Sequence, residues 1–301
     1  MRRAAISALL AAALLAAIGC GGRENEGKGK VFTDSLGRTV KLKGPPRRIV
    51  SMAPSVTEML FALGLGEEIV GVTDYCDYPP EAEKKPKIGG YYRPSVERII
   101  SLSPDLVVAT ADGYNRDVVL KLEEAGIPVY VVNPRTVEGV IEEIERLGKV
   151  VGREREAAEL AGEMRGRVEA VRRRAAAIPP SKRPRVFFEI GRDPLVTAGP
   201  NTFIDDLITL AGGINIAGDS PMPWPKFSIE TVIERKPDLI ISASHVGSPQ
   251  SFWGRFDEIP AVRKGLVFEV SDISKFVRPG PRIVEALEEM SAMIMRAVGH
   301  D

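Results

Sequence analysis

Short apolar runs alternate with segments of helical period along most of this chain. In the first half the apolar runs lie at 49–52, 69–73, 106–110 and 129–132, and the helical patterns at 56–64, 95–102, 115–125 and 137–151. Such alternation is typical of βα units, in which helices cover a mainly parallel sheet. A hairpin is expected before them, with strands at 31–33 and 39–42 around a turn-forming Asp-Ser-Leu-Gly.

A long helix is expected in the middle of the chain, at 153–178. This segment is rich in Ala, Glu, Arg and Leu, contains no Pro, keeps a helical apolar period and ends before two prolines. A helix of this length would measure roughly 35–40 Å, which is enough to bridge two lobes. Beyond it the alternation returns, with apolar runs at 186–190, 239–242 and 266–270 and helical patterns at 201–211, 228–235 and 281–298.

One internal repeat relates the two halves. The sequences SVERII at 95–100 and PDLVV at 104–108 recur 133 residues later as SIETVI at 228–233 and PDLII at 237–241. Each copy predicts a Ser-capped helix, a Pro-Asp turn and a buried strand. We therefore expect an α/β fold of two lobes, 31–152 and 179–301, each a mainly parallel sheet flanked by helices. A ligand would bind in the cleft between the lobes.

The N-terminus has the pattern of a lipoprotein signal. Arg2 and Arg3 precede an apolar run that is too short for a mature membrane span and ends at Gly19-Cys20. Residues 1–19 are expected to be removed, which leaves Cys20 as an acylated first residue; an ordinary signal peptide that contains a Cys is the alternative. Residues 20–30, rich in Gly and charge, are expected to form a flexible tether. The protein should therefore be extracytoplasmic and anchored to a membrane by lipid.

Composition and missing motifs exclude several classes of protein. The 41 basic residues balance the 41 acidic ones, whereas a nucleic-acid-binding protein would have a basic excess. With Cys20 acylated, Cys76 is the only remaining thiol, so no internal disulfide is expected. The sequence contains no GxxxxGK[ST] phosphate loop and no HExxH, GxSxG or CxxC motif. An enzyme is not expected, and any ATP hydrolysis would belong to a partner chain.

Aromatic residues gather in two loops. Five of the six Tyr residues fall between positions 75 and 114, and Trp224 lies between two prolines in the corresponding loop of the second half. Rigid rings on Pro-stiffened loops suit a planar macrocycle, since they offer flat apolar faces at a small cost in ordering. The alternative is that these rings cap the sheet ends as part of the core, as is expected for Tyr130 and Trp253.

Two segments and both copies of the repeat resemble the family of vitamin B12, siderophore and haem binding proteins. These segments are RIVSMAPSVTE at 48–58 and GVTDYCDYP at 71–79, and the resemblance runs from about Val31 to the C-terminus. It implies two α/β lobes joined by one backbone helix, whose stiffness would limit lobe closure to a small motion. It also implies a monomeric substrate-binding protein of an ABC importer, without a cofactor. Its partners would be a dimeric permease and the cytoplasmic ATPase subunits.

The resemblance further implies which ligand is bound. Residues 75–79, 223–225 and 278–282 are most similar to the cobalamin binders, so cobalamin or a related corrinoid is the expected ligand. A ferric siderophore or haem is the alternative, although an anionic siderophore would need several convergent cations, and these loops are richer in Tyr and Trp than in clustered basic residues. A receptor for bare zinc or manganese is not expected, because the chain has only two His residues and one of them, His300, is next to the C-terminus.

Individual residues can be given expected roles. The helix dipole favours a carboxylate in the first turn of each repeat helix, and the resemblance implies that Glu97 and Glu230 dock to arginines of the permease. Arg278 is the preferred hydrogen-bond donor to the ligand, whereas Arg282, inside the next helix, is expected to be structural. Neither His245 nor Cys76 is expected to bind metal. The expected ligand contacts are Tyr75, Tyr78, Tyr91, Tyr92, Arg93, Trp224, Phe276 and Arg278.

Overall fold

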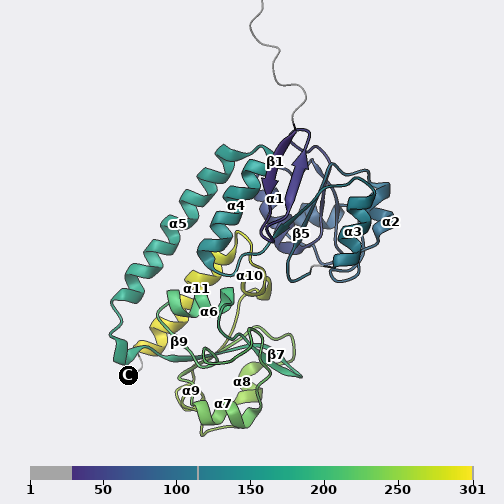
Figure 1. Ribbon diagram of the computed structural model, residues 1–301. Coiled ribbons are helices and arrows are strands. Elements are labelled where there is room, and N and C mark those ends of the chain that lie inside the picture. The colour runs from purple at the N-terminus through teal and green to yellow at the C-terminus, as the bar shows by residue number, and fades with distance from the viewer. Residues whose placement is uncertain (1–28, 114, 300–301) are drawn as a thin grey trace, which may run out of the picture.

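The computed structural model describes residues 29–113 and 115–299, which form two lobes joined by one long helix (Figure 1). The α/β architecture of two parallel-sheet lobes, expected from the sequence, is confirmed. The expected signal segment 1–19, the lipidation site Cys20, most of the tether 20–30 and His300 lie outside the described residues. Within the described part of the chain, no helix is long and apolar enough to cross a bilayer.

The N-terminal lobe is built on a parallel sheet of four strands in the order β4-β3-β5-β6. Its strands are β3 (Ile49–Ser51), β4 (Ile69–Val72), β5 (Leu106–Thr110) and β6 (Val129–Val132). Its helices are α1 (Pro54–Ala62), η1 (Pro80–Lys84), α2 (Val96–Ser101), α3 (Arg116–Glu124) and α4 (Val137–Val151). The hairpin of β1 (Lys30–Thr33) and β2 (Thr39–Leu42) precedes them. Because helices cover both faces, β5 and β6 are buried throughout and appear in the sequence as unbroken apolar runs.

The C-terminal lobe has a second sheet in the order β11-β10-β7-β8, with β9 also paired to β7. Its strands are β7 (Arg185–Arg192), β8 (Leu195–Thr197), β9 (Ile214–Asn215), β10 (Leu239–Ser242) and β11 (Val267–Glu269). Its helices are η2 (Pro180–Lys182), α6 (Phe203–Leu210), α7 (Ile229–Arg235), α8 (Pro249–Trp253), α9 (Pro260–Arg263), α10 (Ile273–Val277) and α11 (Ile283–Val298). The antiparallel strand β8, and β9 and α8 to α10, are elements of two to five residues. Such short elements show no hydrophobic period, and they were not expected from the sequence.

The repeat in the sequence produces the same local structure in both lobes. In the first, the carboxylate of Asp105 accepts from the backbone N–H of Arg48, whose guanidinium donates to the carbonyl of Leu102 at the end of α2. In the second, Asp238 accepts from the N–H of Arg185, whose guanidinium donates to the last carbonyl of α7. Arg48 therefore links the start of β3 to the end of α2, and Arg185 links the start of β7 to the end of α7. In both cases the guanidinium binds carbonyls that have no partner within the helix.

The long helix α5 (Glu154–Ala176) occupies the position expected at 153–178, and it packs with its N-terminal half against α4 and with its C-terminal half against α6 and α11 (Figure 1). Ion pairs flank these apolar contacts. Arg165 binds Glu138 and Glu145 of α4, and Arg167 binds Glu288 of α11. The helix thus contacts the last helix of the first lobe and two helices of the second.

The two sheets are separate, but their hydrophobic cores are connected. One cluster of buried side chains includes Leu106 from the first sheet, Ile241 from the second, and Val168 and Val171 of α5. Each sheet has a further, smaller cluster of its own on the opposite face. From the sequence, a long helix was expected to bridge two lobes with separate cores. The lobes instead share one core, because the helices around α5 bury their apolar faces against each other and against both sheets.

Two glycines test the packing between α4 and α5. A Cβ atom at Gly148 would lie 2.4 Å from the Cβ of Ala157, whereas one at Gly162 would meet nothing within 4 Å. We predict that Gly148→Ala lowers the free energy of unfolding by about 1–3 kcal/mol through overpacking. Gly162→Ala should raise it by about 0.5–1 kcal/mol, since Ala is the better helix former. Urea unfolding followed by circular dichroism measures both, and similar effects of the two changes would contradict this packing.

Candidate functional site

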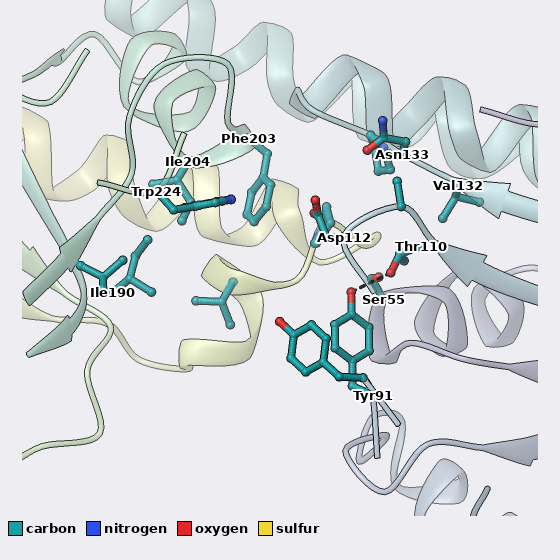
Figure 2. A pocket seen from close by; sticks show the side chains of 16 residues that line it. Ser55, Tyr91, Thr110, Asp112, Val132, Asn133, Ile190, Phe203, Ile204 and Trp224 are labelled. Atoms are coloured by element: carbon teal, nitrogen blue, oxygen red, sulfur yellow. Dashed lines mark hydrogen bonds between the residues drawn. The ribbon is translucent and has the colours of Figure 1, made fainter. Parts of the chain in front are cut away.

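A cleft of about 490 Å³ lies between the lobes, at the carboxyl ends of the central strands (Figure 2). This is where open parallel sheets usually bind their ligands, because the strand-to-helix loops of each sheet meet there. Both lobes contribute to its walls. The lining residues are Ser55, Tyr91, Tyr92, Thr110, Ala111, Asp112, Val132, Asn133, Pro134, Ile190, Val196, Phe203, Ile204, Trp224, Val277 and Pro279.

Two tyrosines form the aromatic wall of the N-terminal lobe. The hydroxyl groups of Tyr91 and Thr110, the last residue of β5, are 2.7 Å apart and share a hydrogen bond. The ring of Tyr92 meets that of Tyr91 edge to face, with centroids 4.7 Å apart, and Tyr92 is 69% exposed. Burial raises the pKa of Tyr91. A Cβ atom at Gly113 would lie 2.6 Å from the Tyr91 ring, so only glycine lets the loop approach this closely.

Trp224 and Phe203 form the opposite wall, on the C-terminal lobe. Their ring centroids are 6.1 Å apart in an edge-to-face arrangement, and Figure 2 shows both facing the cleft. The loop that carries Trp224 is fixed on each side of it, because the carbonyls of Pro223 and Pro225 accept from backbone N–H groups at 199 and 197. Its two prolines further restrict its conformations. The Trp224 ring is therefore held in place before any ligand arrives.

A second cavity, of about 330 Å³, adjoins the first. The two share Ser55, Tyr91, Tyr92, Val277 and Pro279, and the second adds Ala53, Pro54, Tyr75 and Arg278. Arg278 donates to both carboxylate oxygens of Asp77, and this pairing lowers the pKa of Asp77. The arginine thus lies at the cleft, as expected from the sequence, but its guanidinium is already paired with a carboxylate.

The expected contacts Tyr78, Arg93 and Phe276 do not line either cavity. The guanidinium of Arg282 stacks on the ring of Tyr78, 3.8 Å from its centroid. Arg93 is exposed in the turn before α2. Phe276 is fully buried and stacks on Phe188, so it presents no surface to a ligand. Phe276 lies on α10, directly before the cleft segment, but the helix turns its side chain into the core.

Sequence reasoning missed several residues of the cleft. Phe203 was read only as part of a helix, and Thr110, Asp112 and Asn133 were not singled out. Thr110 is the final residue of β5, Asp112 lies two residues after it, and Asn133 directly follows β6. Their position at the carboxyl ends of predicted strands could have identified them as cleft residues. Nothing in the local sequence marked Phe203, because only the fold brings α6 opposite the tyrosines.

Glu97 and Glu230 have matching local environments, one on each lobe. Each lies in the first turn of its helix, two residues after a Ser cap, and each is fully exposed. The pKa of each carboxyl is lowered first by a hydrogen bond from the backbone of the same residue. A second hydrogen bond, from the side chain of the cap residue Ser95 or Ser228, lowers it further. Both side chains therefore stay ionised near neutral pH and are free to meet a cationic partner.

The described residues offer no evident place for a metal ion. They contain no group of three His, Cys, Asp or Glu side chains arranged to hold one. The thiol of Cys76 is buried and hydrogen-bonded to the hydroxyl groups of Thr57 and Thr73. His245 lies exposed in the loop after β10.

Two solved structures are similar in fold. The vitamin B12 binding protein BtuF of Vibrio cholerae has a TM-score of 0.76 and 29% identity, covering 84% of this chain and 98% of that one. The haem-binding protein RhuT of Roseiflexus sp. RS-1, in its apo form, has a TM-score of 0.74 and 30% identity, covering 84% and 99%. A vitamin B12 binder and a haem binder are thus about equally close.

The sequence comparisons agree with the fold. The chain is 33% identical over 302 residues to the uncharacterized ABC transporter substrate-binding lipoprotein YvrC of Bacillus subtilis, covering 95% of this chain and 94% of that protein. The periplasmic binding protein family matches residues 49–272. The chain therefore belongs to the periplasmic binding protein family and is the substrate-binding component of an ABC importer of the vitamin B12, haem and siderophore type.

Proposed function

We propose that this protein binds cobalamin or a related corrinoid between its lobes and delivers it to the permease of its importer. The observation that carries the proposal is an aromatic cleft with almost no charge. Tyr91 and Tyr92 face Trp224 and Phe203 across it, and Asp112 is the only charged residue among the sixteen that line the larger cavity. A corrin ring is broad and largely apolar, and the amide groups at its edge are neutral.

The charge of the cleft argues against the alternative ligands. Haem carries propionate carboxylates, and many ferric siderophores are anionic, so both would gain from free cations in the walls. The larger cavity has no Lys, Arg or His among its described lining residues, and Arg278 of the smaller one is paired with Asp77. Tyr91 is poorly suited to ligate haem iron as a phenolate, because burial raises its pKa and its hydroxyl is hydrogen-bonded to Thr110.

Titration with three ligands tests the choice. Cyanocobalamin, haemin and a ferric siderophore are added separately to the mature protein while tryptophan fluorescence is recorded. We expect quenching by cyanocobalamin at low micromolar concentration, because Trp224 lies in the cleft whereas Trp253 is fully buried elsewhere. A specific response to haemin or the siderophore, with none to cyanocobalamin, would reverse the assignment of the ligand and leave the importer family unaffected.

A variant shows whether the ligand occupies this cleft. Trp224→Ala should weaken cyanocobalamin binding about 10- to 100-fold in calorimetric titration, since a buried aromatic face supplies much of the contact area. Phe32→Ala, on the hairpin of the N-terminal lobe, removes an aromatic ring outside the cleft and should leave the affinity unchanged. Equal affinities of the two variants would place the ligand elsewhere.

Glu97 and Glu230 are the proposed docking groups, each meeting an arginine of one permease subunit. We predict that Glu97→Lys combined with Glu230→Lys abolishes transport while the affinity for the ligand stays within about twofold, because neither side chain lines the cleft. The control reverses two other exposed carboxylates, Glu124 and Glu258, one on each lobe. Transport assays on cells or proteoliposomes compare the two double variants. Normal transport by the Glu97 and Glu230 double variant would exclude docking through these carboxylates.

The lipid anchor at Cys20 is also a proposal, supported by the sequence pattern before it. Acylation would hold the binding protein close to its permease. Cys20→Ser should move the protein from the membrane fraction to the soluble fraction without changing its affinity for the ligand. Cys76→Ser serves as the control, because this thiol is buried in the N-terminal lobe. Unchanged fractionation of the Cys20 variant would exclude the anchor.

A further inference from the structure

One buried carboxylate joins the two lobes directly. Glu58, in α1 of the N-terminal lobe, is 4% exposed. Its Oε2 accepts from Nε of Arg282 at 2.9 Å and its Oε1 accepts from Nη2 at 2.7 Å, although Arg282 is the N-cap residue of α11 in the C-terminal lobe. Two parallel hydrogen bonds between planar groups fix orientation as well as distance. A residue of one lobe is thus bound directly to the N-cap of a helix of the other.

Further charges surround this pair. Nη1 of Arg278 lies 3.4 Å from Oε1 of Glu58 and also donates to Asp77, so this second arginine of the C-terminal lobe contacts two carboxylates of the N-terminal lobe. The remaining edge of Arg282 donates to Asp272 at 2.8 Å, and Tyr78 covers its face. Every hydrogen bond between the Glu58 carboxylate and the described residues therefore comes from an arginine of the opposite lobe.

These contacts position part of the cleft lining. The segment 277–280 begins at the last residue of α10 and leads toward α11, and its residues Val277 and Pro279 line both cavities. Gly280 is seated directly on α1, since a Cβ atom there would lie 3.4 Å from Oε2 of Glu58 and 3.5 Å from the carbonyl oxygen of Ser55. Any displacement of Arg282 from Glu58 would therefore move the lining formed by 277–280 relative to Ser55.

We propose that Glu58 is a positioning residue for the ligand cleft: by binding Arg282 and Arg278 it fixes segment 277–280 against α1 and so sets the spacing between the aromatic walls. The identity of the ligand in this inference rests on the proposed function, but the effect on lobe spacing does not. A buried ion pair contributes little net stability compared with an apolar pair of similar shape, and its best-attested use is to specify one arrangement among several.

The distance between the lobes provides the direct test. Nitroxide labels are attached to Glu124→Cys and Glu258→Cys, one exposed position on each lobe, in a Cys20→Ser background; Cys76 is buried and should stay unlabelled. Double electron–electron resonance then compares the full chain with its Glu58→Gln and Arg282→Lys variants. Gln keeps the shape of Glu58 without its charge, and Lys keeps the charge of Arg282 without the bidentate geometry.

We expect both variants to broaden the interlobe distance distribution in the absence of ligand. Corrinoid binding should weaken about tenfold, because only a fraction of the molecules would then have the cleft width that binds the ligand. Glu189→Gln is the matched control. Glu189 is also buried and paired with an arginine, Arg192, but both belong to the C-terminal lobe. The control should lose stability without any change in the distance distribution.

Unchanged distance distributions in the Glu58 and Arg282 variants would overturn the proposal, even if their affinity for the ligand fell. If Glu58→Gln does not fold, the distance distribution of Arg282→Lys alone tests the proposal by the same criterion. Absence of corrinoid binding by the unmodified protein would refute the proposed ligand, and the distance measurement would still decide the role of Glu58.

Discussion

The two lobes of this protein are joined by one group of packed helices, in which α5 runs along the outer side of α4 and α11 (Figure 1). Because α5 contacts α4, α6 and α11, the apolar cores of the lobes are continuous, and neither lobe can turn far without exposing buried side chains. Polar contacts between the lobes add direction to this constraint. The backbone N–H of Val137 at the start of α4 donates to Asp206 of α6 at 2.7 Å, and Glu58 holds Arg282. The cleft is thus largely formed before a ligand arrives.

The cleft achieves its low charge by pairing the ionised groups around it. Asp112 on the rim lies 3.3 Å from Arg135, and Arg278 is paired with Asp77. What remains toward the ligand is mainly aromatic and aliphatic surface held by fixed loops. Such a site gains affinity through preorganised apolar contact, with a few polar groups to set orientation. The proposal of a broad, largely neutral macrocycle as the ligand rests on this arrangement.

The two lobes are alike where their sequences are alike and differ where the sequences diverge. The repeated Ser caps, Pro-Asp turns and paired arginines give α2 and α7 equivalent settings, which place one exposed carboxylate on each lobe. Within the described residues, the antiparallel β8 and helix α10 have no counterpart in the first lobe, and the short helices α8 and α9 connect β10 to β11 where the single helix α3 connects β5 to β6. The C-terminal lobe therefore provides a different cleft wall, built from Trp224 and Phe203, although its repeat helix α7 is equivalent to α2.

Local sequence determined the regular elements, the repeat and the loops that carry the cleft aromatics. Apolar period, caps and turn residues act over a few positions, so Tyr91, Tyr92 and Trp224 were identified from their loops alone. Only the tertiary structure decided that Phe276 faces the core, that Arg278 is paired with Asp77, and that Phe203 stands opposite the tyrosines. It also decided that the lobes share one core and that Glu58 meets Arg282 across 224 residues. These outcomes depend on which surfaces the fold brings together, and no pattern within a single segment encodes the position of its distant partner.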